Sequence, residues 1–202
     1  MPRPREFDTK EAIANICDQF WSDGYEATGI ADLESATGLA RARLYSAFGS
    51  KQEMLYEAID FYLESRINVI FRRVDDGGIT GVANFFRTFA GIVAKQPERA
   101  EMGCLVVNSM IEFGRSEPEL VARADTYRER VRGAFRSALE RDAAQGRLAG
   151  DVESLADLAY VMLMGLYVTV KGGAPLEEIN RLCGIAIAVV ESWRVDPERR
   201  AS

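Results

Sequence analysis

The chain of 202 residues contains no histidine. This absence excludes Ser-His-Asp and Cys-His catalysis as well as zinc sites that depend on imidazole. Cysteine is scarce too, and Cys17, Cys104 and Cys183 lie far apart with no CxxC spacing, which excludes zinc-ribbon and thioredoxin-like motifs. Paired-carboxylate motifs, metal-ligand spacing and phosphate-binding loops are also missing. We therefore predict a protein without enzymatic activity, metal or cofactor, and the sparse cysteines favour the reducing cytoplasm.

Long hydrophobic runs are lacking as well. The first residues include Arg3 and Arg5 and lead into no apolar stretch, so they do not read as a secretory signal. The longest apolar stretch, Leu158–Val170, is interrupted by Gly165 and is short for a bilayer span. We interpret it as a helix buried on two sides and expect no membrane insertion.

Proline is scarce, at six residues, and few stretches alternate with a period of two. Hydrophobic residues make up 48% of the chain, which is enough for a substantial core. Together these features predict an all-α fold of about nine helices, with a helix-turn-helix head over residues 1–52 and a regulatory and dimerisation bundle over residues 53–202. Capping signals and glycines place the helices at about residues 9–23, 30–37, 40–48, 51–75, 79–95, 97–114, 118–145, 152–170 and 175–193.

The net charge of −6 argues, taken alone, against a nucleic-acid partner. The average hides a local pattern, because residues 38–52 carry Arg41, Arg43 and Lys51 and no acidic residue. Arg3 and Arg5 add a basic tail. Salt screens the remote acids within roughly 8–10 Å, so this small basic region still attracts phosphates at short range.

Two predicted helices of about eight residues flank a glycine-containing turn at Gly38, which is the pattern of a helix-turn-helix. The second of them offers polar side chains from its first turns, where a recognition helix contacts base edges. We predict DNA contacts from six residues, with Thr28 and Lys51 on phosphates: Thr28, Arg41, Arg43, Tyr45, Ser46 and Lys51. The alternatives are solvated side chains for Arg41, Arg43 and Lys51 and partial core packing for Tyr45.

A characteristic set of residues lies in the segment from about residue 9 to 56: Gly24-Tyr25-Glu26-Ala27-Thr28, Ile30, Asp32-Leu33, Ala36, Gly38-Leu39, Leu44-Tyr45, Phe48, Ser50-Lys51 and Leu55. With these residues the segment resembles the N-terminal domain of the TetR family of transcriptional repressors. The resemblance implies a homodimer that binds a palindromic double-stranded DNA operator, joins through its last two helices and is released by a small-molecule effector. Four positions depart from the family pattern: Gly29, Ala31, Glu34 and Arg43.

If the regulatory domain binds an effector, its pocket needs apolar lining residues and a few polar side chains that orient the ligand. The residues predicted to do so are Phe89, Asn108, Glu112, Tyr127, Met162 and Tyr167. Ordinary core packing, or a surface charge for Glu112, is the alternative reading of each. Residues 103–145 look like one common branch of the family, some members of which sense oxidants or electrophiles through a cysteine. Cys104 is the candidate for such a sensor, and an inert core cysteine is its alternative.

The last two predicted helices are too apolar for a single core-facing stripe, which indicates burial against both the subunit core and a partner subunit. This supports a homodimer independently of the resemblance. Two other functions stay open at this point. One is a dimeric protein-interaction module that has lost DNA binding, and the other is an enzyme on a helical scaffold.

Overall fold

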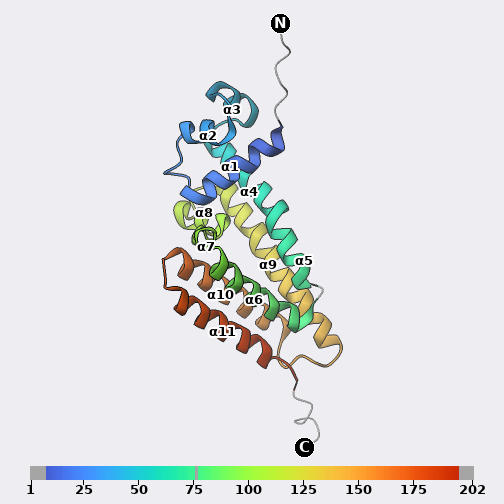
Figure 1. Ribbon diagram of the computed structural model, residues 1–202. Helices are drawn as coiled ribbons and strands as arrows, with labels where there is room; N and C mark the ends of the chain where they lie inside the picture. Colours follow the sequence, from blue (N-terminus) through green and yellow to red (C-terminus); the bar gives the residue numbers. More distant parts are fainter. Residues whose placement is uncertain (1–7, 76, 196–202) are drawn as a thin grey trace, which may run out of the picture. The chain divides into compact units, whose positions relative to one another are not determined.

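The structure, a computed structural model, describes residues 8–75 and 77–195 (Figure 1). Within these ranges the chain forms eleven α-helical segments and one π-helical segment, and no strand. The predicted all-α class is therefore confirmed. The expectation of about nine helices is confirmed as well: the segments number eleven because a π-helical stretch interrupts the long fourth helix and an extended residue splits the sixth. Arg3 and Arg5 lie outside the described residues.

The described chain packs as two compact units. The first comprises Met1–Arg66 and Cys104–Ala124. Its helices are α1 (Thr9–Asp23), α2 (Ile30–Thr37), α3 (Arg41–Phe48), α4 (Lys51–Tyr62), α8 (Leu105–Phe113) and the start of α9 (Pro118–Ala144). Helix α1 packs on α2 and α4, whereas α3 contacts α2 and α4. Because α4 and α8 also pack within it, this unit extends beyond the helix-turn-helix expected at residues 1–52.

Capping explains where the helices of the first unit begin. Asp8 accepts hydrogen bonds from the backbone N–H of Lys10 and Glu11, which starts α1. Ser50 and Glu53 form the predicted capping box of α4: Ser50 Oγ accepts from Glu53 N at 3.2 Å, and Glu53 Oε2 accepts from Ser50 N at 2.6 Å. These bonds fix the point at which the chain turns from α3 into α4.

The single helix predicted over residues 97–114 is a wrong prediction. The structure forms α7 (Pro97–Glu101) and α8 (Leu105–Phe113), separated by Met102, Gly103 and Cys104. Gly103 has a φ of +69°, in the left-handed region that favours glycine, and Cys104 is extended with φ −119° and ψ 124°. Cys104 is therefore the N-cap residue of α8 rather than a residue inside a helix.

The second unit comprises Ile67–Gly103 and Asp125–Ser202. Its helices are α5 (Asn68–Asp75), α6 (Gly78–Lys95), α7, the rest of α9, α10 (Val152–Lys171) and α11 (Leu176–Ser192). Helix α6 packs along α11, and α11 also contacts α10. A cluster of aromatic rings forms the centre of this unit, with ring centroids 5.0 to 6.4 Å apart: Phe71, Phe85, Phe86 and Phe135.

A buried carboxylate, Asp142 of α9, holds the start of α6. Its Oδ2 accepts a hydrogen bond from Ile79 N at 2.6 Å, and its Oδ1 accepts one from Arg147 Nε at 2.8 Å. Gly78, with a φ of +59°, approaches this carboxylate so closely that a Cβ there would lie 2.5 Å from Asp142 Oδ2. The glycine is thus required both by the backbone conformation and by the close approach.

By length and composition, α10 is one helix among the described residues that is long and apolar enough to cross a membrane. One such helix is weak evidence for a membrane span, because the core helix of a protein outside the membrane meets the same criteria. Helix α10 contacts α7 and α11 in the second unit, and salt bridges join it to α9.

Candidate nucleic-acid interface

The turn between α2 and α3 has the geometry predicted for a helix-turn-helix. Gly38 ends α2 in the left-handed conformation, with φ 69° and ψ 11°, and Ala40 is extended at the N-cap of α3. Leu33 of α2 and Leu44 and Phe48 of α3 are buried and anchor the two helices on the first unit. The spacing of Leu44 and Phe48 leaves the opposite face of α3 on the surface.

The exposed face of α3 carries four of the six residues predicted to contact DNA. Arg41, Arg43, Tyr45 and Ser46 are all exposed, with 37% of Tyr45 accessible. The Arg41 guanidinium lies over the Tyr45 ring, 5.5 Å from its centroid. The structure thus exposes two guanidiniums, a phenol and a hydroxyl around the solvent-accessible part of a short helix, and this is the donor set that contacts bases and phosphates.

Two of the positions that depart from the family pattern have local structural roles. Glu34 of α2 accepts a hydrogen bond from Arg41 N at 2.6 Å, which satisfies a first-turn N–H of α3 that the N-cap Ala40 leaves open. At the start of α2, Asp32 Oδ2 accepts from Gly29 N at 2.7 Å. A carboxylate seven residues before a helix start carries no local capping pattern, so sequence reasoning missed Glu34.

The predicted phosphate contact requires an exposed Thr28 hydroxyl, and the structure places this side chain in the interior of the first unit. Its side chain is fully buried, and its hydroxyl donates to the carbonyl of Gly24 at 2.6 Å. The side chain therefore fixes the turn between α1 and α2 from inside. The interface proposed below excludes it.

Lys51, at the first turn of α4, has its ammonium 4.2 Å from the centroid of the Tyr25 ring. This cation–π contact compensates for a positive charge at a helix N-terminus. Partial burial first, and then the neighbouring Glu26 carboxylate, raise the pKa of Tyr25, so the ring stays a neutral phenol. The side chain of Lys51 is only half-buried, and its predicted contact with a phosphate stays a prediction.

Glu112 was predicted to contact a ligand, and the structure places its carboxylate on the turn between α1 and α2. Its Oε2 accepts from Tyr25 N at 3.1 Å and its Oε1 accepts from Glu26 N at 2.7 Å. The next residue, Phe113, packs on the Tyr25 ring with centroids 4.9 Å apart. Helix α8 thus holds the turn that precedes the helix-turn-helix, a long-range contact for which the sequence carries no local signal.

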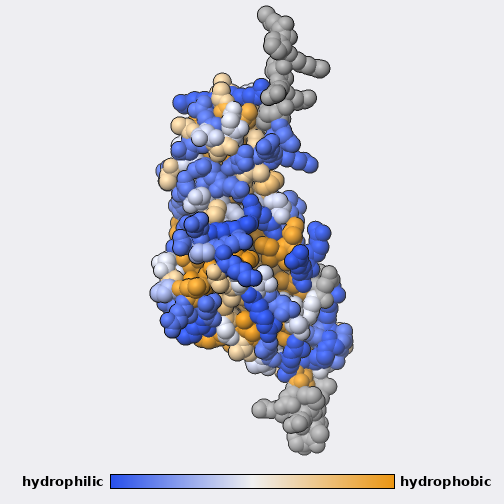
Figure 2. Space-filling model, in the orientation of Figure 1, coloured by the Kyte–Doolittle hydropathy of each residue, from blue (hydrophilic) through white to orange (hydrophobic). Residues whose placement is uncertain are grey.

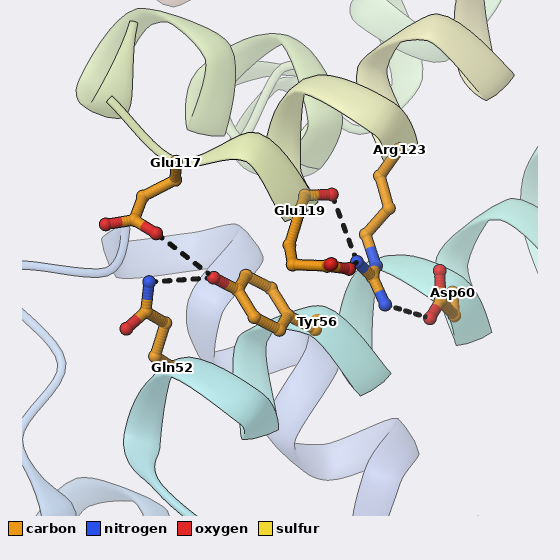
Figure 3. Close-up of polar contacts among 6 residues, drawn as sticks. All are labelled: Gln52, Tyr56, Asp60, Glu117, Glu119 and Arg123. Carbon is orange, nitrogen blue, oxygen red and sulfur yellow. Dashed lines mark hydrogen bonds and ion pairs between the residues drawn. The ribbon is translucent and has the colours of Figure 1, made fainter. Parts of the chain in front are cut away.

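A polar network ties α4 to the start of α9 within the same unit (Figure 3). Tyr56 of α4 accepts from Gln52 Nε2 at 2.7 Å and donates to Glu117 Oε2 at 3.4 Å. Arg123 of α9 donates to Asp60 Oδ2 at 2.8 Å, and its guanidinium lies 4.7 Å from the centroid of the Tyr56 ring. Figure 3 also shows Glu119 beside Arg123, to which it is bound at 3.0 Å.

The residues predicted to contact an effector are divided between the two units. Phe89 of α6 and Tyr167 of α10 meet edge to face, with centroids 5.5 Å apart, and Tyr127 of α9 is fully buried in the same unit. Met162 of α10 is half-buried there, whereas Asn108 belongs to the first unit. Phe89 and Tyr167 thus lie in contact within the second unit, and an effector contact by any of these residues stays a prediction.

All three cysteines are buried free thiols. Burial raises the pKa of Cys17 to about 12 and that of Cys183 to about 11, so both remain protonated and poorly nucleophilic near neutral pH. Cys104 is fully buried at the N-cap of α8. Its predicted role as a redox sensor stays a prediction.

Two family models match the chain. The description "Bacterial regulatory proteins, tetR family" fits residues 12–58, and "Tetracyclin repressor-like, C-terminal domain" fits residues 78–172. The chain is 28% identical to the HTH-type transcriptional regulator YezE of Bacillus subtilis (strain 168), covering 95% of this chain and 100% of YezE. It is 24% identical to the HTH-type transcriptional repressor ComR of Escherichia coli (strain K12), covering 92% of this chain and 90% of ComR.

A solved structure gives a similar match. The fold superimposes with a TM-score of 0.78 on a cysteine-substituted variant of the TetR family transcriptional regulator CifR, solved with a 26-base-pair double-strand operator DNA. That protein is 30% identical, and the match covers 92% of this chain and 98% of the CifR chain.

Proposed function

The chain belongs to the TetR family of bacterial regulatory proteins, and from this premise we propose that it is a homodimeric repressor of a palindromic operator, released by a small-molecule inducer. Family membership makes it a DNA-binding transcriptional regulator and not an enzyme, as the sequence predicted. TetR regulators bind double-stranded operator DNA, as the operator complexes of CifR illustrate. Binding to chromosomal operators would place the protein in the cytoplasm.

The exposed donor face of α3 is the observation that carries the proposal. Arg41, Arg43, Tyr45 and Ser46 project from a helix whose other face is anchored by Leu44 and Phe48. In a helix-turn-helix this is the helix that enters the major groove. We assign base or phosphate contacts to these four side chains and a phosphate contact to Lys51.

A partner subunit would explain the apolar surface of α10 and α11. Val161 and Val168 of α10 are 62% and 54% exposed, and Ile185 of α11 is 49% exposed. Figure 2 shows hydrophobic side chains reaching the surface among the helices of the second unit. Gly165 and Gly184 lie on the same two helices with open space above their Cα atoms, which permits close helix approach. We assign this surface to the homodimer interface, where water would be excluded from it.

The second unit supplies the inducer-binding function in this proposal. The contact between Phe89 and Tyr167 joins α6 to α10, which itself carries the assigned interface. A ligand held by one subunit beside these helices would alter the packing of the interface and thereby the spacing of the two α3 helices. Repression follows from operator occupancy, and induction from the loss of that spacing.

Selection of genomic fragments with the purified full chain tests the proposal. We expect enrichment of fragments that share a palindrome with half-sites about one helical turn apart, roughly 34–36 Å. A parallel selection with Arg41→Ala should lose the enrichment, whereas Arg73→Ala, which removes the same charge from the exposed surface of α5, should retain it. Absence of a common motif with the native chain would leave the protein-interaction module as the better reading.

A further inference from the structure

We propose that a cavity between α5 and α9 binds a small organic carboxylate with an apolar body. The cavity has a volume of about 320 Å³ and is open to solvent. It lies within the second unit and is lined by Ile67, Asn68, Phe71, Arg72, Arg130, Ala134 and Ser137. A volume at the low end of known ligand sites suits a small ligand. None of these residues belongs to the effector set predicted from the sequence.

The lining combines cations with an apolar floor. Arg72 and Arg130 bring two guanidiniums to the same cavity, and guanidinium binds carboxylate through paired N–H donors. Ile67 and Phe71 also line the cavity and are buried side chains, and Phe71 packs on Phe85 and Phe135 at centroid distances of 5.0 and 5.5 Å. The apolar part of the ligand would contact Ile67 and Phe71, and its carboxylate would bind the guanidiniums of Arg72 and Arg130.

Polar side chains hold the cavity in shape. Arg130 donates to Asn68 Oδ1 at 3.1 Å, which bridges α9 to α5 and orients the guanidinium. Ser137, about two turns further along α9, adds a hydroxyl to the lining. Inorganic phosphate would contact only the guanidiniums. An organic carboxylate would also contact the apolar side chains of the lining, so we expect it to bind more tightly than phosphate.

The cavity adjoins, along the chain, the segment that leads to the first unit, and the regulatory part of the proposal rests on the proposed function. Ile67 is both a lining residue and the end of the π-helical segment Leu63–Ile67, which joins α4 to α5. The preceding residue, Arg66, pairs with Asp18 of α1 at 2.6 Å and lies 4.8 Å from the Trp21 ring centroid. Single π-helical turns are frequent at functional sites, and here one connects α4 to α5, which lines the cavity, along the chain.

Calorimetric titration of the full chain with 2-naphthoate tests the site. Naphthoate should bind, whereas 2-naphthamide, its neutral analogue, and inorganic phosphate should bind at least tenfold more weakly. Arg130→Gln should weaken naphthoate binding about tenfold, and Arg72→Gln about threefold because Arg72 is more exposed. Arg130→Lys keeps the positive charge but loses the planar guanidinium with its paired N–H donors. Its naphthoate affinity should lie between that of the native chain and that of Arg130→Gln.

Arg73→Gln is the matched control, because it removes the same charge from the neighbouring position on α5 and does not line the cavity. Equal weakening by Arg73→Gln, or equal binding of naphthoate and naphthamide, would overturn the proposal. Operator titration separates the two claims: an operator complex with no naphthoate binding refutes the site alone. Naphthoate binding by a chain that selects no operator refutes the proposed function and leaves the site standing.

Discussion

Replacement of Glu112 tests whether α8 controls the conformation of the DNA-binding head. Glu112→Ala removes the carboxylate that accepts from Tyr25 N at 3.1 Å and from Glu26 N at 2.7 Å. Both bonds are charge-assisted, but the side chain is exposed, so water replaces part of what is lost. Loss of a comparable capping carboxylate costs about 1 kcal/mol, and we expect a decrease in unfolding free energy of about 1–2 kcal/mol.

Amide hydrogen exchange resolves this effect at the two N–H groups themselves. A local loss of about 1 kcal/mol speeds exchange at Tyr25 and Glu26 by about fivefold, while amides in the core of the second unit keep their native rates. Glu112→Gln keeps one acceptor oxygen and should give an intermediate result. Glu57→Ala removes an exposed carboxylate from α4 and is the control for charge alone.

The result separates two roles for the same side chain. If Glu112 positions the turn, operator affinity should fall by a few-fold because α2 begins directly after that turn. Unchanged exchange at Tyr25 and Glu26, together with native urea stability, would refute the positioning role. Weakened effector binding in the same variant would then favour the ligand contact that the sequence predicted.

Four further substitutions test the interface, the dimer and the core. Arg41→Ala and Arg43→Ala should each weaken operator binding about tenfold in fluorescence anisotropy, with unchanged thermal unfolding; native affinity in both would remove α3 from the DNA contact. Val161→Glu should dissociate the dimer in sedimentation equilibrium, and Val69→Glu, at an apolar position on α5 that is 51% exposed, should not. Asp142→Ala should lower unfolding free energy by about 2–3 kcal/mol in urea, since it leaves Ile79 N and Arg147 without their acceptor; a smaller loss than that of Glu112→Ala would contradict this.

Features that depend on near neighbours in the chain were predictable from the sequence. Apolar periodicity and local capping signals place α1, α2, α3 and α10 within a residue or two of their observed ends. The exposed face of α3 followed in the same way, because Leu44 and Phe48 lie four residues apart and can share one buried side.

Features that depend on distant contacts were not predictable. Glu112 finds its partners 86 and 87 residues earlier in the chain, and Glu34 caps a helix seven residues further on. The break at Gly103 was missed because the apolar pattern continues across it while the backbone turns through a positive φ. Thr28 was placed at the surface by its helix-start position, yet its hydroxyl satisfies the Gly24 carbonyl inside the unit.

Hydroxyl-radical footprinting on a selected operator tests the central claim most directly. The account predicts two protected half-sites on one face of the duplex, with centres one helical turn apart, because two α3 helices enter successive major grooves. At a protein concentration close to the native dissociation constant, Arg41→Ala, which should bind about tenfold more weakly, should lose both footprints together. A single protected site, or protection that persists in the variant, would contradict a dimeric regulator that reads DNA through α3.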